Sequence, residues 1–103
     1  MEAETVQFDP NALPVRRASV CCHELDGEAV LYDPAHHAVH YLNATAYLIW
    51  QHCDGHTKVP ALLNKVAAHF ADVETDTLIR ELEAALDRLV RNGLVDWGQL
   101  RAA

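Results

Sequence analysis

The chain lacks several features that large classes of protein require. It has no run of about 18 apolar residues, so we expect no membrane-spanning helix. Its four glycines form no phosphate-binding loop, and its three cysteines contain no CxxC pair. Cys21 and Cys22 are adjacent, a spacing that rarely forms a disulfide, and Cys53 leaves the count odd. These absences argue against a nucleotide-binding fold and a disulfide scaffold, and we expect reduced thiols.

Positive charge is also scarce. Lys and Arg number 8 against 15 Asp and Glu, which gives a formal charge of −7. Before Lys58 the only cations are Arg16 and Arg17. An acidic surface repels a phosphate backbone, so a basic or partly apolar partner is favoured over nucleic acid. The alternative is that the charge serves only solubility.

Length and terminal sequence suggest one small cytoplasmic domain. A chain of 103 residues, half of them hydrophobic, suits a single core. The first residues, Met1-Glu-Ala-Glu, are acidic and polar, unlike a signal peptide. Residues 1–17 lack periodicity and contain Pro10 and Pro14, so we predict a flexible N-terminal arm.

Three β-prone segments follow the arm. Asp26-Gly27 lies between the first two and is a strong hairpin signal, because both residues tolerate positive φ. Pro34 ends the second segment, since proline cannot donate to a strand ladder. The sequence therefore predicts an antiparallel three-stranded meander, with strands at residues 19–25, 28–33 and 37–42.

Helical patterns fill the second half. Asn43 is a good N-cap for a first helix that ends at Asp54-Gly55. We predict that Thr57 caps a second helix with Pro60 in its first turn. A third helix is expected from about Glu74 to Asn92, where Asn92-Gly93 is a C-cap signal, and residues 94–97 suggest a short final strand or wing.

The predicted fold is thus α+β and resembles a winged helix-turn-helix, with a three-stranded sheet followed by three helices. We place the domain at residues 18–97 and a tail at 98–103. This fold raises a DNA-binding regulator as the alternative function. Against it, the third helix carries five acids and three arginines, whereas recognition helices usually present positive or amide-rich faces.

Few residues suggest chemistry. A zinc site could draw on Cys21, Cys22 and His23 with the histidines near the third strand, but no recognised ligand spacing is present. We therefore expect no metal, no other cofactor and no catalysis. Cys22 and His23 are sequence neighbours, and strand geometry points such side chains apart. Tyr47, Trp50 and Phe70 recur near helical spacing and are expected in the core, not in a ligand site.

Five segments resemble the PqqD-like family, also called RiPP recognition elements, across about residues 18–96. They are Leu25–Asp33, Leu42–Trp50, Asp54-Gly55, Val59–Phe70 and Leu89–Leu94. The resemblance implies a winged-helix-like module that binds the leader segment of a ribosomally made precursor peptide. Such a module presents the precursor to a modifying enzyme, often a radical-SAM protein. The peptide would add as a strand to the sheet edge and lie against the last helix.

The sequence supports this mode independently of the resemblance. A meander leaves an exposed edge that can template an added strand, and the third segment has no Pro or Lys to prevent pairing. Ala84, Ala85 and the leucine stripe could form a pocket wall. The alternatives are an edge covered by the N-terminal arm and an interaction subunit without peptide binding; a homodimer is left open. The predicted peptide-binding residues are His37, Ala38, Val39, His40, Tyr41, Leu42, Leu78, Leu82, Ala85 and Leu89.

Overall fold

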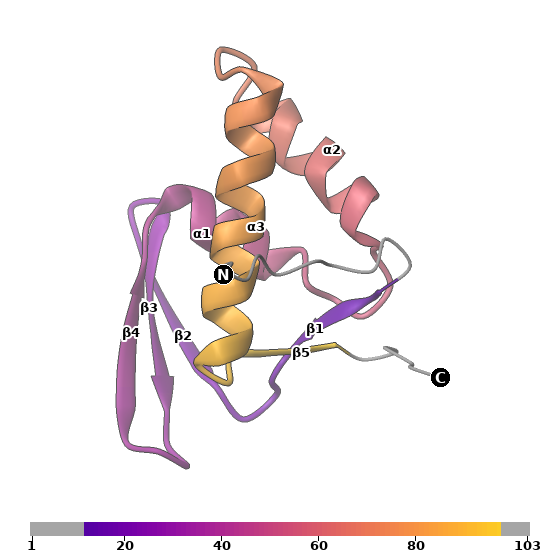
Figure 1. Cartoon of the computed structure of the whole chain (residues 1–103). Helices are drawn as coiled ribbons and strands as arrows, with labels where there is room; N and C mark the ends of the chain where they lie inside the picture. Colours follow the sequence, from indigo (N-terminus) through magenta and orange to yellow (C-terminus); the bar gives the residue numbers. More distant parts are fainter. Residues whose placement is uncertain (1–11, 98–103) are drawn as a thin grey trace, which may run out of the picture.

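The helices lie on one side of a small antiparallel sheet, with the first helix against it and the second packed on the other two helices (Figure 1). The structure, a computed structural model, describes residues 12–97. The sheet contains β2 (Cys21–Leu25), β3 (Glu28–Asp33) and β4 (Ala38–Leu42) in the order β2-β3-β4. This confirms the predicted α+β class and the meander. No helix in the described range is long and apolar enough to cross a membrane.

Two different turns connect these strands. Asp26 and Gly27 have φ values of 54° and 83°, which form the type I′ turn expected from the sequence. Between β3 and β4, the carboxylate of Asp33 accepts a hydrogen bond from the Ala35 amide at 3.0 Å and lies 2.7 Å from His36 Nδ1. These partners satisfy a carboxylate that is otherwise buried. His37 has a φ of 52° and belongs to this turn, so β4 begins one residue later than predicted.

Helix α1 (Ala44–Gln51) packs against the buried face of the sheet. Its start is fixed by Asn43, whose side-chain oxygen accepts a hydrogen bond from the Ala46 amide at 2.9 Å. This confirms the predicted N-cap. Because α1 begins directly after β4, the cap also holds the end of that strand beside the helix.

Helix α2 (Val59–His69) carries Pro60 in its first turn, as predicted, but Thr57 is not its cap. The N-cap position is Lys58, whose side chain makes no capping hydrogen bond. The hydroxyl of Thr57 instead donates to the carboxylate of Asp54 at 2.9 Å. The prediction of a Thr57 cap was therefore wrong, because a carboxylate three residues earlier takes its hydroxyl.

Helix α3 (Thr75–Arg91) is the longest helix of the described range. Gly93 follows it with a φ of 74°, and the Leu94 amide donates to the Leu89 carbonyl at 2.9 Å. This is the predicted glycine stop, since a left-handed residue lets the last carbonyls find donors.

A second, two-stranded sheet pairs β1 (Pro14–Arg16) with β5 (Val95–Trp97), which confirms the short final strand. Strand β1 falls within the span predicted as a flexible arm, so the last part of that span is ordered. It is also tied to the end of α1, because the Arg16 amide donates to the Cys53 carbonyl at 2.8 Å. Residues 1–11 of the arm and the tail (98–103) lie outside the described residues.

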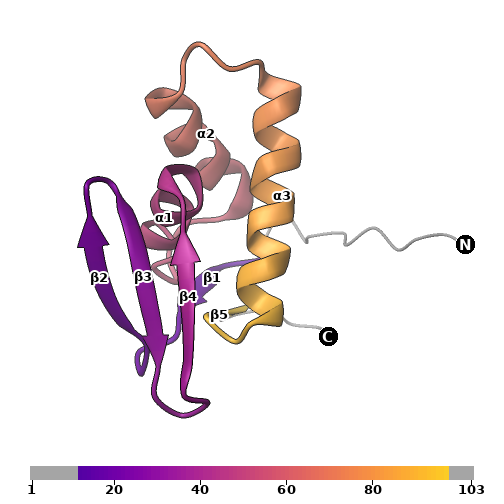
Figure 2. The same ribbon diagram turned by 90° about the vertical axis from the view of Figure 1, so that its left-hand side faces the viewer.

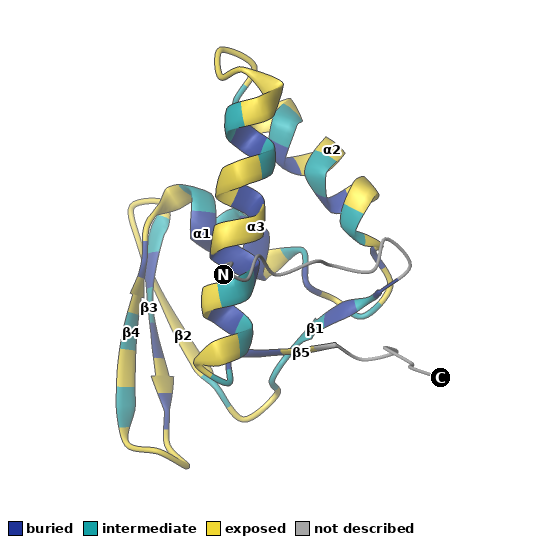
Figure 3. Cartoon of the chain, viewed as in Figure 1, coloured by how far each residue is buried: buried dark blue, intermediate teal, exposed yellow. Residues whose placement is uncertain are grey.

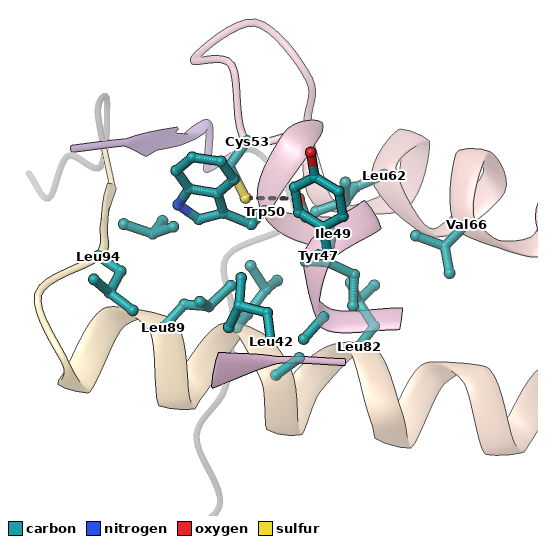
Figure 4. Close-up of a cluster of buried hydrophobic side chains, with 14 of the residues drawn as sticks. Leu42, Tyr47, Ile49, Trp50, Cys53, Leu62, Val66, Leu82, Leu89 and Leu94 are labelled. Carbon is teal, nitrogen blue, oxygen red and sulfur yellow. Dashed lines mark hydrogen bonds between the residues drawn. The ribbon is translucent and has the colours of Figure 1, made fainter. Parts of the chain in front are cut away.

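The core lies where α1, α2 and α3 meet the inner face of β3 and β4 (Figures 3 and 4). Tyr47 and Trp50 are buried and stack with ring centroids 6.4 Å apart, and the half-buried Phe70 packs against the cluster. The prediction that these aromatic residues belong to the core is confirmed.

Candidate peptide-binding edge of the sheet

Strand β4 forms one border of the three-stranded sheet. Among the described residues it pairs only with β3, and α3 stands beside it (Figure 2). Strand β1 pairs with β5 instead, so the described part of the predicted arm does not cover this border. A strand with one unpaired side offers a row of main-chain donors and acceptors.

The register shows which groups of β4 face this side. A two-residue type I′ turn closes on a hydrogen-bonded pair, here Leu25 and Glu28. Hydrogen-bonded and non-hydrogen-bonded pairs alternate along an antiparallel ladder. Three pairs from the turn, Leu31 is therefore in a non-hydrogen-bonded pair with β2. Its N–H and C=O groups point to β4, where Leu31 lies opposite His40. The N–H and C=O groups of the neighbours of His40, which are Val39 and Tyr41, therefore point to the free edge.

A hollow of about 240 Å³ lies at the end of β4, between the start of α1 and the middle of α3. Two alanines of α3 lie in it, and Glu81 and Arg88 border them about one turn away on either side. Small side chains leave room for a side chain from another chain, and the two charges have opposite signs. The lining residues are Asn43, Thr45, Ala46, Glu81, Ala84, Ala85 and Arg88.

The strand residues predicted to bind a peptide differ in their surroundings. Val39 and Tyr41 are exposed, Ala38 and His40 are half-buried, and Leu42 is buried in the core. His37 lies in the turn before the strand. Only the alternate residues Val39 and Tyr41 thus present both main-chain groups and exposed side chains.

The helix residues predicted as the groove wall divide into two groups. Leu78, Leu82 and Leu89 are buried in the core and do not line the hollow. Ala85 lines it, although only 4% of its surface is exposed. The leucine stripe therefore holds α3 in the fold, and the neighbouring helix face borders the hollow.

The prediction omitted several residues of this hollow. Glu81 and Arg88 flank the alanines at helical spacing. Small residues between opposite charges are therefore the sequence pattern that could have predicted the hollow. Asn43 was predicted only as a cap, and Thr45 and Ala46 only as part of a helix. Their position at the hollow depends on how α1 packs against α3, which local sequence does not state.

The thiols lie apart from this edge. Cys21 and Cys22 are exposed on β2, whereas Cys53 is buried. Burial raises the pKa of the Cys53 thiol to about 12, so this thiol stays protonated. In the described residues, no three His, Cys, Asp or Glu side chains are close enough together to hold a metal ion.

Comparisons with known proteins identify the family and a similar fold. The family model described as Coenzyme PQQ synthesis protein D (PqqD) matches residues 28–95, more than half of the chain. The structure of TbiB1 in complex with the TbiA(beta) leader peptide is similar, with a TM-score of 0.69 and 20% sequence identity. The alignment covers 86% of this chain and 99% of TbiB1. A search of curated proteins finds no match. With its meander, three helices and matching segments, the chain belongs to the PqqD family.

Proposed function

We propose that this chain is a peptide-binding adaptor that captures the leader segment of a ribosomally made precursor peptide and presents it to a modifying enzyme. The observation that carries the proposal is the side of β4 next to α3, which pairs with no described strand, in a member of the PqqD family. The structurally similar TbiB1 holds a leader peptide, which supports the same class of ligand here.

The leader would add to the sheet as a fourth strand beside β4. Its main chain would bond to the outward N–H and C=O groups of Val39 and Tyr41, which gives affinity with little dependence on sequence. Selectivity would come from the hollow, where a side chain of the leader would rest against Ala84. Glu81 and Arg88 would favour polar or oppositely charged neighbours at its borders.

Catalysis belongs, in this proposal, to the partner enzyme. That enzyme is expected to be a radical-SAM protein, and the complex is expected in the cytoplasm. The adaptor contributes binding and position, and it requires no metal or other cofactor. A homodimer is compatible with the proposal if its interface leaves the free side of β4 open.

Calorimetric titration of the chain with the leader half of the co-encoded precursor tests the proposal. We expect saturable binding to the leader and, at physiological salt, weak binding to duplex DNA of any sequence. Tight, sequence-selective DNA binding without leader binding would replace the adaptor with the alternative, a winged-helix regulator.

A further inference from the structure

The outer face of the β2–β3–β4 sheet, which is the face opposite the helices, is unusually apolar for an exposed surface. Large hydrophobic side chains are exposed at five described positions, and four of these lie on this face. The register places them together, because Glu28, Val30 and Tyr32 alternate with the buried residues of β3. The four are Leu25, Tyr32, Val39 and Tyr41, with 56%, 39%, 66% and 64% of their surfaces exposed.

This pattern departs from that of an ordinary open sheet. An antiparallel sheet with one face on the core usually places polar residues on the other face. Here cross-strand neighbours on the open face include Tyr32 with Val39 and Val30 with Tyr41. A cluster of exposed apolar side chains usually marks an interaction surface, whereas single ones are common.

The charge around this face restricts what can cover it. Residues 18–57 contain no Lys or Arg, so no such cation borders the strands from their own segment. The hairpin end of the face carries Asp26 and Glu28, and Glu28 accepts a hydrogen bond from the Tyr41 hydroxyl at 2.5 Å. A second copy of the chain would bring the same carboxylates against these, and like charges repel. An anionic membrane would be repelled for the same reason. A protein with an apolar centre and a Lys- or Arg-rich border fits best.

We infer that the outer face of this sheet is the docking surface for the peptide-modifying enzyme; the inference rests on the proposed function. A leader paired with β4 extends the sheet, and every second leader side chain then lies beside Val39 and Tyr41 on the same face. The enzyme would therefore contact a surface made of adaptor and leader together. Leader and enzyme then bind cooperatively, and each raises the affinity for the other by the same factor.

Lysine substitutions on the outer face, away from β4, test this inference. Leu25→Lys and Tyr32→Lys add a cation where a basic border is expected to dock, and neither residue lines the hollow or belongs to β4. Val73→Lys is the matched control, because Val73 is the remaining exposed large hydrophobic residue and lies between α2 and α3. Each purified variant is titrated with the modifying enzyme encoded beside this chain, with and without saturating leader.

We expect both outer-face variants to lose affinity for the enzyme by about tenfold or more, and Val73→Lys to bind like wild type. Leader affinity in the absence of enzyme is expected to stay within about twofold of wild type, because the edge is untouched. Wild-type enzyme affinity is expected to rise when leader is present.

Other outcomes would overturn the inference. Outer-face variants that bind the enzyme like wild type would remove the docking surface while leaving the proposed function intact. Self-association by sedimentation, or binding to phosphatidylserine vesicles, that is lost in the same variants would assign the face to a second copy or a membrane. Equal enzyme affinity with and without leader would exclude the shared surface. If the leader itself does not bind, the proposed function fails, and the leader-free titration still tests the face.

Discussion

Among the described residues, the β2–β3–β4 sheet has two unpaired edges. Each borders a hollow, but the surroundings of the two edges differ. The β4 edge lies beside α3, and its hollow of about 240 Å³ contains alanines. The β2 edge is the open border of the sheet in Figure 2. Its hollow of about 340 Å³ contains larger groups, among them Glu24, Tyr47 and Phe70.

The two edges also differ in their side-chain hydrogen bonds. At the β2 edge the Tyr47 hydroxyl donates to the Glu24 carboxylate at 3.1 Å, which joins the strand to α1. Burial and this hydrogen bond raise the pKa of Tyr47 to about 12, so the hydroxyl remains a donor to Glu24 at physiological pH. In the larger hollow, at the β2 edge, the polar groups of Tyr47 and Glu24 are thus already hydrogen-bonded to each other. The smaller hollow, at the β4 edge, leaves space beside alanines. The chemistry of the lining, not the volume, favours the β4 edge for a peptide.

The largest expected effect is a loss of folding stability, from truncation of a core residue that supports both edges. Trp50 is 7% exposed and stacks on Tyr47. Truncation of a buried Trp typically costs about 3–5 kcal/mol, a large share of a small domain's stability. We expect Trp50→Ala near the lower figure, because Trp50 Nε1 has no hydrogen-bond partner among the described residues. Denaturant unfolding measures the loss, with the exposed Val73→Ala as control. Unchanged stability would place Trp50 outside the core.

The next largest effect is a loss of leader affinity, which distinguishes the β4 hollow from other helix surfaces. Ala84 is exposed and lines the hollow, so Ala84→Asp adds a charge there without burying it in the core. We expect leader affinity to fall by about tenfold, or 1.4 kcal/mol, with little change in melting temperature. Ala68→Asp on the exposed side of α2 is the control and is expected to bind normally. Ala85→Asp tests the same contact less cleanly, because Ala85 is nearly buried. Normal leader binding by Ala84→Asp would exclude the hollow.

A smaller effect concerns pH and the turn that leads into β4. The hydrogen bond from His36, together with that from the Ala35 amide, holds the pKa of Asp33 below its ordinary value of 3.8. A carboxyl whose pKa is lower in the folded state contributes stability above the unfolded pKa. That contribution is lost as pH falls through the folded value. We expect Asp33→Asn to be less stable than wild type at neutral pH and the difference to shrink below about pH 4. A difference that does not change with pH would contradict this role of the carboxylate.

The smallest expected effect is an absence of change at the β2 edge. Cys21 and Cys22 lie on β2 and are exposed, whereas Cys53 is buried and its thiol donates to the Ile49 carbonyl at 3.2 Å. We expect a thiol reagent to label the first two in the native state and the third only after unfolding. Saturating leader is expected to leave the β2 labelling rates within about twofold. Strong protection of Cys21 and Cys22 by the leader would move the peptide to the β2 edge.

Local signals predicted most of the fold because each acts over a few residues. Asp26-Gly27 fixed the hairpin, Asn43 the start of α1, and Gly93 the end of α3. The Thr57 cap was wrong for a local reason, because Asp54 takes its hydroxyl. Other features depend on distant contacts that local signals do not report. Strand β1 forms because β5, about eighty residues later in the chain, and residues 53–55 lie on either side of it. The leucines of α3 suit a core or a groove equally well, and the packing of α1 against α3 decides between them.

Proline substitution at matched positions of the two edges tests the central claim most directly. Counted along the same ladder, Cys22 on β2, opposite Leu31, directs its main-chain groups away from β3, as Val39 does on β4. Each variant, Val39→Pro and Cys22→Pro, loses one free-edge donor, and circular dichroism and melting temperature verify that both stay folded. In calorimetric titration with the leader, Val39→Pro is expected to bind about tenfold more weakly or worse, and Cys22→Pro like wild type. Normal binding by Val39→Pro, or a loss confined to Cys22→Pro, would contradict strand addition at β4.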